Sequence, residues 1–499
     1  MKQKLADIFS RIPVLPQVCR WVKAHRKAVK RTIVVMAHVT GALTSVQAIM
    51  ETRTSQGAIA WAVSLNTFPY VAVPAYWVFG QSSFDGYVKL RQSEADEIDP
   101  IFEKVRGDFV DGNFLVTPNV ANRSVVEKLA KLSTSRYNSA ELLIDGEDTF
   151  EAIFESIEAA EDYVLVQFYI VRDDTLGNRL KDLLLKKAAE GVRVYFIYDE
   201  IGSHDLAASY ISSLRDGGID IRPFNTRQGN SNRFQINFRN HRKIVVADGK
   251  VAFVGGHNVG DEYLGHNEEF GRWRDTHVKV EGPIALAVQL TFVEDWNWAA
   301  GSMLTDINWK PKRAANDNLK ALCLATGPAD RFESCALFFL HSINSAKKRL
   351  WIASPYFVPD EQTVSALTLA ALRGVDVRIL LPEKADSTLV HLSSFSYLRA
   401  AEKAGIKIYR YTDGFLHQKA MLVDDDTSAI GTANFDNRSF RLNFEITLLF
   451  KDVDFASEVE AMFEQDFKGS RQVTAKELES QSFPFRFAVK CSRLLAPVQ

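Results

Sequence analysis

The sequence carries one polar pattern twice, and this duplication constrains the fold more than any other feature. The first copy runs from His241 to Asn258, and the second runs from His417 to Asn434. Each copy has a histidine, a lysine two residues later, an aspartate five residues after the lysine, and then Gly-x-x-Asn, and the set recurs 176 positions along the chain. Chance readily produces one HxKxxxxD pattern, but not two with the same tail at the same spacing. The chain is therefore predicted to contain two related halves.

Short apolar runs follow each histidine–lysine pair. Residues 244–247 read Ile-Val-Val-Ala and residues 420–423 read Ala-Met-Leu-Val, which predicts two buried strands. Residues two apart share a face of a strand, so each histidine points the same way as its lysine. The turn at Asp248-Gly249 and its counterpart at residues 424–426 predict a return strand in each half. Each return strand should bring its Gly-x-x-Asn segment beside the histidine and lysine.

Strands and helices alternate around these motifs. The expected first-half elements are a strand at 140–144, a helix at 148–160, a strand at 163–170, a helix at 177–190 and a strand at 192–198. The expected second-half elements are a helix at 332–345, a strand at 349–353, a helix at 363–373 and a strand at 375–381. This repeated order predicts an α/β fold in which each half supplies one histidine, lysine and asparagine. A complete site then requires the two sets to face each other across a pseudo-dyad.

Histidine, lysine and asparagine in two copies suit chemistry at a phosphodiester. The lysines and asparagines can donate hydrogen bonds and positive charge to the non-bridging oxygens without a metal ion. One histidine can attack phosphorus while the other protonates the leaving oxygen. The motifs contain no acidic cluster for magnesium, so we expect no metal and no cofactor. The alternative, that each histidine and lysine merely ends a strand, is reasonable for one copy but not for two matched copies.

The duplicated motif resembles that of the phospholipase D superfamily, whose members carry two HxKxxxxD motifs. Further segments resemble the bacterial cardiolipin synthase branch, namely residues 240–243 (Asn-His-Arg-Lys), 255–263 (Gly-Gly-His-Asn-Val-Gly-Asp-Glu-Tyr), 354–360 (Ser-Pro-Tyr-Phe-Val-Pro-Asp) and 434–439 (Asn-Phe-Asp-Asn-Arg-Ser). The resemblance covers nearly the whole chain. It implies two tandem phospholipase D-like α/β/α sandwich lobes related by a pseudo-dyad, with an N-terminal helical membrane hairpin.

The resemblance also implies an activity. A cardiolipin synthase is a phosphatidyltransferase that moves a phosphatidyl group from one phosphatidylglycerol to a second lipid alcohol and releases glycerol. The superfamily assigns the first histidine as the nucleophile of a phosphatidyl-histidine intermediate and the second as the acid, which the symmetry of the sequence cannot decide. The alternatives with the same residues are a phospholipase D that hydrolyses phospholipids to phosphatidic acid and a phosphatidylserine synthase. The apolar N-terminus and near-neutral charge disfavour a nuclease.

The candidate catalytic residues are His241, Lys243, Asp248, His417, Lys419 and Asp424. Both aspartates of this set end their strands at turns, so we expect them to brace the motif. The candidate substrate-binding residues are Asn258 and Asn434, which would hold the non-bridging oxygens. The resemblance adds Asp275 and Glu445 as carboxylates that accept a hydrogen bond from a catalytic histidine and fix its tautomer. His257 could line the pocket, whereas the remaining histidines have no partner pattern.

The length and charge of the chain bound its organisation. A chain of 499 residues exceeds one ordinary core. We expect a basic leader with a membrane-associated helical region at 1–95, a first lobe at 96–310, a second lobe at 311–482 and an amphipathic tail at 483–499. The net charge of −2 argues against nucleic acid as a partner. The four cysteines form no CxxC pair, which disfavours a zinc site and favours a reducing compartment.

The expected partners are phosphatidylglycerol and other membrane phospholipids. The sequence leaves the oligomeric state open, and a homo-oligomer is compatible with it.

Residues 1–31 hold nine Lys or Arg against one acidic residue, and two stretches without formal charge follow at 32–50 and 57–80. A spanning helix needs about 20 residues, so these stretches predict two membrane spans. A re-entrant or interfacial hairpin and a soluble hairpin are the alternatives, and a cleaved signal peptide fits less well because the basic leader is long.

The basic leader predicts a cytoplasmic N-terminus. A hairpin then places the catalytic lobes in the cytoplasm, at the bacterial inner (cytoplasmic) membrane. Residues 204–240 interleave arginine with phenylalanine, and either bind an acidic phospholipid or form a solvated insertion with a few buried aromatic residues. Polar residues 297–318 predict a linker between the halves. Residues 483–495 mix phenylalanine and leucine with arginine and lysine, which favours an amphipathic segment on a membrane over a helix packed on the second half.

Overall fold

The computed structural model describes residues 21, 23–80, 84, 86–89, 103, 105–225, 237–267, 271–315 and 318–499. The chain divides into two compact units, Met1–Ser82 and Ser83–Gln499. The described part of the first unit is helical, and the second unit carries both copies of the polar motif.

The first unit contains α3 (Arg26–Glu51), α4 (Ser55–Thr67) and α5 (Pro69–Phe79). The buried residues of α3 are a stripe of small side chains, Gly41, Thr44, Ser45 and Ala48. A Cβ atom at Gly41 would lie 2.2 Å from the carbonyl oxygen of Leu65 in α4, so the two helix backbones can approach this closely only at glycine. Small residues at such an interface are typical of helices that pack together in membranes.

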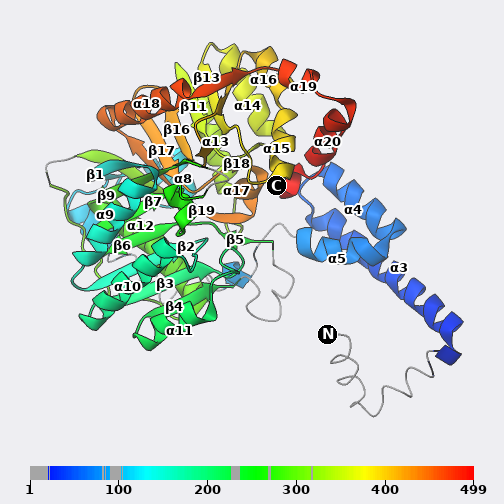
Figure 1. The fold of residues 1–499 in the computed structure, drawn as a ribbon, viewed down its shortest axis with the longest axis horizontal. Helices are drawn as coiled ribbons and strands as arrows, with labels where there is room; N and C mark the ends of the chain where they lie inside the picture. Colours follow the sequence, from blue (N-terminus) through cyan, green and yellow to red (C-terminus); the bar gives the residue numbers. More distant parts are fainter. Residues whose placement is uncertain are drawn as a thin grey trace. The chain divides into compact units, whose positions relative to one another are not determined.

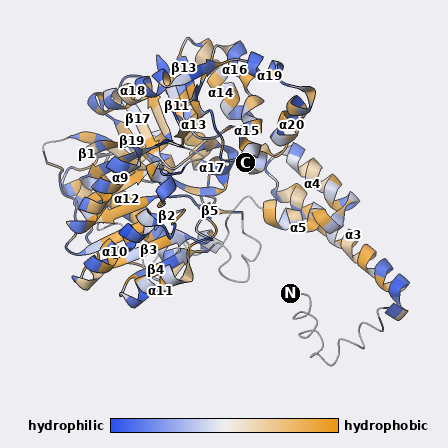
Figure 2. Cartoon of the chain, viewed as in Figure 1, coloured by the Kyte–Doolittle hydropathy of each residue, from blue (hydrophilic) through white to orange (hydrophobic). Residues whose placement is uncertain are grey.

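The large apolar side chains of α3 face outward. Each of the following is more than half exposed: Ile33, Val35, Met36, Val39, Leu43, Val46, Ile49 and Met50. Within the described residues, α3 is the one helix whose 26 residues are long and apolar enough to cross a membrane (Figure 2). The length of α3 and its apolar outer surface support membrane association of the first unit.

The second uncharged stretch does not form one continuous helix. It breaks at Phe68 into α4, with 13 residues, and α5, with 11 residues. Pro69 begins α5, because proline suits the first turn of a helix but cannot donate the hydrogen bond that would continue the preceding one. Neither helix reaches the roughly 20 residues that a span needs. Among the residues that the structure describes, one helix therefore reaches spanning length, whereas the sequence predicts two.

The second unit holds the two halves. The first half comprises η1 (Val120–Asn122), α8 (Val125–Ala130), β1 (Ser135–Ile144), α9 (Asp145–Glu158), β2 (Tyr163–Phe168), α10 (Thr175–Ala189), β3 (Arg193–Asp199), α11 (Ala208–Asp216), β4 (Asp220–Phe224), β5 (Arg239–Asn240), β6 (Ile244–Ala247), β7 (Val251–Gly255), η3 (Asp261–Leu264), β8 (Trp273–Arg274), β9 (Thr276–Glu281) and α12 (Pro283–Ala300).

The second half comprises β10 (Leu319–Thr326), α13 (Ser334–Ser345), β11 (Arg349–Ala353), β12 (Phe357–Val358), α14 (Glu361–Leu372), β13 (Asp376–Pro382), α15 (Thr388–Phe395), α16 (Leu398–Ala404), β14 (Lys407–Tyr411), β15 (Phe415–Leu416), β16 (Ala420–Val423), β17 (Thr427–Gly431), β18 (Phe435–Asp436), α17 (Asn437–Arg441), β19 (Asn443–Lys451), α18 (Val453–Lys468), β20 (Ser470–Val473), α19 (Lys476–Glu479), α20 (Phe483–Arg493) and η4 (Ala496–Val498).

One sheet runs through both halves, in the strand order β20-β14-β13-β11-β16-β17-β19-β10-β1-β9-β7-β6-β2-β3-β4. The order reads the same way outward from its centre, since β9, β7, β6 and β2 of the first half match β19, β17, β16 and β11 of the second. β1 and β10 pair antiparallel at that centre. The two predicted lobes are confirmed, and a pseudo-two-fold axis at this strand pair relates them (Figure 1).

Helices cover both faces of this sheet and produce α/β/α layers. α12 and α18 cover one face, over a single apolar core to which both halves contribute, including Val288 and Phe292 of α12 and Val459 and Phe463 of α18. On the other face, α9, α10 and α11 cover the first half, and α13, α14 and α16 cover the second. The two lobes therefore share one apolar core on the first face of the sheet, and each lobe has a further core of its own on the other face.

Most of the predicted elements recur within a few residues of their expected bounds, and β11 spans residues 349–353 as predicted. The predicted linker begins later than residue 297, because α12 continues to Ala300. Residues 204–240 include α11 and β4, and Phe224 and Phe238 are buried in the shared core, as the insertion alternative expects of a few aromatic residues. Arg227, Arg233 and Phe234 of that segment lie outside the described residues.

Candidate active site

Two short strand pairs join the halves and place the histidines. β5 runs parallel to the start of β19, with Arg239 opposite Asn443 and Asn240 opposite Phe444. The backbone N–H of His241 then donates to the carbonyl oxygen of Phe444, with N and O 2.9 Å apart. The chain therefore enters the first motif along a strand of the second half.

The second motif is placed in the reciprocal way. β15 runs parallel to β8, with Phe415 opposite Trp273 and Leu416 opposite Arg274. The backbone N–H of His417 donates to the carbonyl oxygen of Arg274 at 2.8 Å. Each HxK segment pairs with the backbone of the opposite half. Two motifs that are distant in sequence therefore meet at the boundary between the halves, which we call the seam.

Glu445 is the carboxylate partner of His241. The Nδ1 atom of His241 lies 2.9 Å from Oε2 of Glu445, which is fully buried. The hydroxyls of Thr432 and Ser439 donate to the same carboxylate at 2.6 and 2.7 Å. Burial alone would raise the pKa of Glu445, but His241 and these hydrogen bonds outweigh burial and bring the pKa below its ordinary value. Hydrogen bonds from the protein therefore take the place of water around the buried carboxylate of Glu445.

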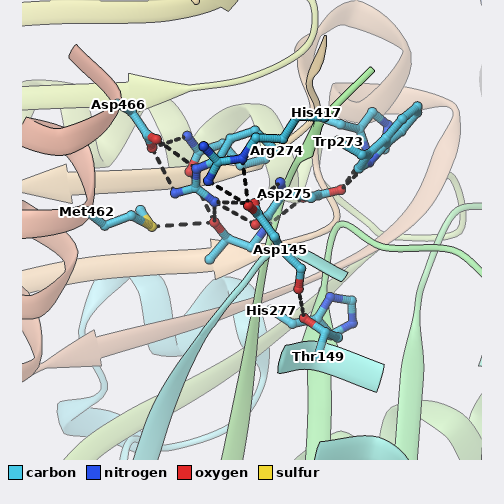
Figure 3. Close-up of polar contacts among 12 residues, drawn as sticks. Asp145, Thr149, Trp273, Arg274, Asp275, His277, His417, Met462 and Asp466 are labelled. Atoms are coloured by element: carbon cyan, nitrogen blue, oxygen red, sulfur yellow. Dashed lines mark hydrogen bonds and ion pairs between the residues drawn. The ribbon is translucent and has the colours of Figure 1, made fainter. Parts of the chain in front are cut away.

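Asp275 is the carboxylate partner of His417 (Figure 3). The Nδ1 atom of His417 lies 2.7 Å from Oδ2 of Asp275, and the backbone N–H of Thr276 donates to Oδ1 at 2.8 Å. A Cβ atom at Gly256 would lie 2.0 Å from Oδ1, so glycine leaves room for the carboxylate. Burial acts to raise the pKa of Asp275, but His257 and the cations around it lower the pKa below its ordinary value.

These two hydrogen bonds cross between the halves. Asp275 belongs to the first half and orients the histidine of the second, whereas Glu445 does the reverse. Each carboxylate follows its own motif in the chain, so the crossing is not evident from sequence order. A histidine that donates Nδ1–H to a carboxylate keeps the lone pair of Nε2 for another partner.

Burial determines the protonation of both histidines. It lowers the pKa of His241 to about 4, against the opposing charge of Glu445. It lowers the pKa of His417 to about 3, where the Lys419 ammonium reinforces burial and Asp275 opposes it. Both imidazoles are therefore neutral near pH 7, the form in which Nε2 is a nucleophile or a base.

Each motif lysine bends back to its histidine and is buried. The Nζ atom of Lys243 donates to the carbonyl oxygen of His241 at 2.6 Å and lies 5.3 Å from the ring centre of Tyr169. The Nζ atom of Lys419 lies 2.9 Å from Nδ1 of His417 and also donates to the carbonyl oxygen of that residue. Both lysines therefore donate to the backbone of their own histidine, and Lys419 also lies beside the ring of His417.

The two lysines share one electrostatic environment. Burial lowers the pKa of Lys243 well below its ordinary value and lowers the pKa of Lys419 to about 8. Asp275 and Glu445 oppose this effect at both lysines, although the carboxylates come from opposite halves. Across the described part of the chain, no group of three or more His, Cys, Asp or Glu could hold a metal ion.

The two asparagines of the motif tails occupy unlike positions. Asn258 accepts a hydrogen bond from the N–H of Ile170 at 3.0 Å and donates to the hydroxyl of Tyr263 at 3.1 Å. Asn434 is also buried, but its Oδ1 atom has no hydrogen-bond partner among the residues that the structure describes. The side-chain amide of Asn258 is thus tied to the protein, whereas that of Asn434 keeps an open polar atom.

Asp248 and Asp424 hold the strands beside the motifs. Asp248 accepts from the backbone N–H groups of Glu161, Asp162 and Tyr163 at 2.9–3.1 Å. Asp424 accepts from those of Lys347, Lys348 and Arg349 at 2.7–3.2 Å. These donors lead into β2 and β11, which pair directly with motif strands β6 and β16. Both aspartates sit at the turn with a positive φ, 53° and 54°, which aspartate tolerates better than most residues.

Sequence reasoning missed two buried aspartates on the covering helices. Asp295 of α12 pairs with Arg242, the middle residue of the first HxK segment, at 2.7 Å. Asp466 of α18 accepts from Gln418, the middle residue of the second, at 2.8 Å and pairs with Arg274 of the first half at 2.7 Å. A repeated Phe-x-x-Asp-aromatic pattern, at residues 292–296 and 463–467, is the signal that could have revealed them.

Known proteins share this architecture. The family model described as "Cardiolipin synthase, PLD-like domain" matches residues 153–296 and 339–467. Cardiolipin synthase A of Pseudomonas putida is 47% identical over 466 residues, which cover 93% of this chain and 97% of that protein. Cardiolipin synthase A of Pseudomonas fluorescens is 46% identical over 469 residues, which cover 93% and 98%.

A crystal structure of phosphatidylserine synthase from Haemophilus influenzae Rd KW20 covers 72% of this chain and 95% of its own, with a TM-score of 0.59 and 17% identity, and so shares the fold. The duplicated fold and its paired histidine–lysine sets define an enzyme of the phospholipase D superfamily. Within that class, the chain belongs to the family of phospholipase D-like cardiolipin synthases.

Proposed function

We propose that the protein is a cardiolipin synthase, which transfers a phosphatidyl group from one phosphatidylglycerol to a second lipid alcohol and releases glycerol. The observation that carries this function is the pair of crossed imidazole–carboxylate bonds, which presents two oriented neutral histidines at one seam, each beside a lysine. The near full-length identity to relatives named cardiolipin synthase A supports transfer to a lipid over hydrolysis.

The reaction follows from the properties of the two histidines. Nε2 of His241 attacks phosphorus, the bond from phosphorus to the glycerol oxygen breaks, and His417 gives its proton to that oxygen. The anionic phosphodiester favours the cationic form of His417 on binding, which opposes the effect of burial. In the second step His417 takes the proton of the acceptor hydroxyl, whose oxygen attacks phosphorus and breaks the P–N bond. Lys243 and Lys419 hold the non-bridging oxygens.

An asymmetry between the two carboxylates supports His241 as the nucleophile. The hydroxyls that donate to Glu445 are neutral, although the charge of Lys243 also acts on this carboxylate, so Glu445 can stabilise a phosphorylated, positively charged ring at His241. The Lys419 ammonium lies beside His417 and makes the protonated form of His417 the stronger acid. A strong acid suits the group that must release its proton to the departing glycerol.

A product assay tests the function. Purified protein in detergent micelles with radiolabelled phosphatidylglycerol should form cardiolipin and glycerol in equal amounts, and added chelator should leave the rate unchanged. His241→Ala and His417→Ala should each lower the rate by at least about a thousandfold, because neither chemical step has a substitute group. Phosphatidic acid as the sole lipid product would show that the protein is a hydrolase.

Acid-quenched trapping of the intermediate tests the order of the histidines. With phosphatidylglycerol labelled on phosphorus, His417→Ala protein should retain a trace of covalent label on a peptide that contains His241, because only the proton donor is missing. His241→Ala protein should retain none. Label at His417 in the His241→Ala protein would reverse the assignment.

The pKa of Lys419 predicts how the rate depends on pH. The pKa of this group is lowered to about 8, so the ammonium is present below that pH and is lost as the pH rises through it. We expect kcat/KM to fall above about pH 8, and the fall to disappear in Lys419→Arg, whose guanidinium stays charged. A profile from about pH 6 to 9.5 measures both. A basic limb that is identical in the two proteins would assign it to another group.

We also propose that the protein resides in the bacterial inner membrane with its catalytic unit in the cytoplasm, as the basic leader of residues 1–31 supports. The C-terminal helix α20 supports contact with the bilayer surface. Phe485, Val489 and Ser492 face inward, and the Phe485 ring packs against Phe395 at 5.3 Å. The exposed apolar residues Phe483, Phe487 and Leu494 form an outer stripe, which Arg486, Lys490 and Arg493 border. Such a surface suits anionic headgroups.

Cys491 is exposed on α20, whereas Cys323 and Cys335 are buried, so a Cys19→Ser protein can carry one fluorescent label. In phosphatidylglycerol vesicles, spin-labelled lipids should quench a label on Cys491, and Phe483→Ser with Phe487→Ser should reduce the quenching. A label at Val453→Cys of α18, in a protein that also has Cys491→Ser, is the control.

The side of the membrane is tested separately. In intact spheroplasts an impermeant maleimide should not reach Cys491. Equal quenching at both positions, or labelling of intact cells, would contradict these proposals.

A further inference from the structure

A second hollow lies beside the second motif and is separate from the histidine pair. We name it the acceptor pocket and define it by Tyr356, Asp386, His391, Ser394 and Arg410, which line it. Loop, helix and strand each contribute, since His391 and Ser394 come from α15 and Arg410 from β14.

Arg410 is the unusual member of this pocket. Its side chain is 2% exposed, and its Nη1 atom donates to the carbonyl oxygen of Pro382 at 3.2 Å. Its Nε and Nη2 atoms have no hydrogen-bond partner among the described residues. Glu477 lies 3.5 Å from Nε without a hydrogen bond, and Arg471 already engages that carboxylate at 3.0 Å. Glu477 thus supplies Arg410 with a nearby negative charge, but the two buried donors Nε and Nη2 stay open to a further hydrogen-bond acceptor, and buried guanidinium donors are nearly always paired in folded proteins.

The other groups of the acceptor pocket suit hydroxyls. The hydroxyl of Tyr356 donates to the carboxylate of Asp386 at 2.5 Å. Burial, reinforced by Arg410, lowers the pKa of His391 to about 4, so this imidazole is neutral near pH 7. Arg410 therefore supplies the positive charge of the pocket, Asp386 supplies a carboxylate acceptor, and Tyr356 and His391 are neutral.

A short hydrogen-bonded path connects the acceptor pocket to the second motif. The hydroxyl of Ser354 accepts from the N–H of Phe435 at 2.9 Å and donates to the carbonyl oxygen of Tyr356 at 2.8 Å. Phe435 directly follows Asn434, and its strand β18 pairs with β12, which begins one residue after Tyr356. Lys419 also acts electrostatically on Asp386. The loop that carries Tyr356 is therefore tied to the segment that follows Asn434, and Asp386 lies within electrostatic reach of Lys419.

We propose that the acceptor pocket binds the headgroup of the second lipid, an anionic glycerophosphodiester. Arg410 holds the phosphate of this acceptor, and Asp386 with Tyr356 holds the glycerol hydroxyl that attacks the phosphatidyl-histidine. The proposal rests on the proposed function and names the acceptor that it leaves open. An acceptor with its own phosphate is then favoured over water or free glycerol, because the oxygens of these two molecules are uncharged and bind a guanidinium more weakly than a phosphate does.

Two reactions of the full-length enzyme separate this role from a structural one. Cardiolipin formation from phosphatidylglycerol uses a phosphate-bearing acceptor, whereas exchange of free radiolabelled glycerol into phosphatidylglycerol does not. In Arg410→Gln, cardiolipin formation should fall roughly tenfold to a hundredfold, the range for loss of a charged hydrogen bond. Glycerol exchange should stay within about twofold of the wild-type rate, and it also reports that the active site is folded.

Two further variants sharpen the test. Arg410→Lys keeps the positive charge but loses the planar guanidinium, which can donate two parallel hydrogen bonds to one phosphate. Cardiolipin formation should therefore be faster than in Arg410→Gln but slower than in the wild-type enzyme. Arg399→Gln, which removes an exposed arginine from α16, should change neither reaction. Equal loss of both reactions in Arg410→Gln, or no loss of either, would overturn the acceptor pocket. A wild-type enzyme that exchanges glycerol but forms no cardiolipin would overturn the proposed function, and the acceptor pocket with it.

Discussion

The crossed hydrogen bonds between imidazole and carboxylate are the interaction on which the rest of this site depends. His241 meets Glu445, and His417 meets Asp275, and each pair joins one half of the chain to the other. Breaking a buried carboxylate pair by removing one partner is strongly destabilising, so each half requires the other to keep its carboxylate paired. The site therefore exists only when both halves are folded together, which makes two related lobes function as one enzyme.

The scaffold around these bonds serves the same requirement. The parallel strand pairs β5·β19 and β8·β15 carry each HxK segment onto the opposite half. The buried ion pairs of Arg242 with Asp295 and of Arg274 with Asp466 anchor those segments to the helices that cover the shared core. Because both halves contribute to that core and β1 pairs with β10 at the centre of the sheet, the seam has little freedom to open, and the positions of the two Nε2 atoms follow from the fold.

Much of the fold was predictable, since its signals are local. Apolar runs identified the motif strands, the helical period identified α9, and the Asp248 turn identified the hairpin that follows. The sequence also named the groups that meet at the seam. It did not reveal the break at Phe68, where Pro69 overrides a hydropathy pattern that counts only apolar residues. Nor did it distinguish Asn258 from Asn434, because their difference depends on neighbours such as Ile170 and Tyr263.

By itself, the sequence determined which chemical groups the protein has, and that they come in two matched sets, because spacing and periodicity are properties of short segments. The tertiary structure alone decided which carboxylate serves which histidine. The partners are 204 positions apart for His241 and Glu445 and 142 positions apart for His417 and Asp275. No local pattern encodes contacts at that separation, because they arise only when two halves with similar sequences pack about an axis that neither half contains.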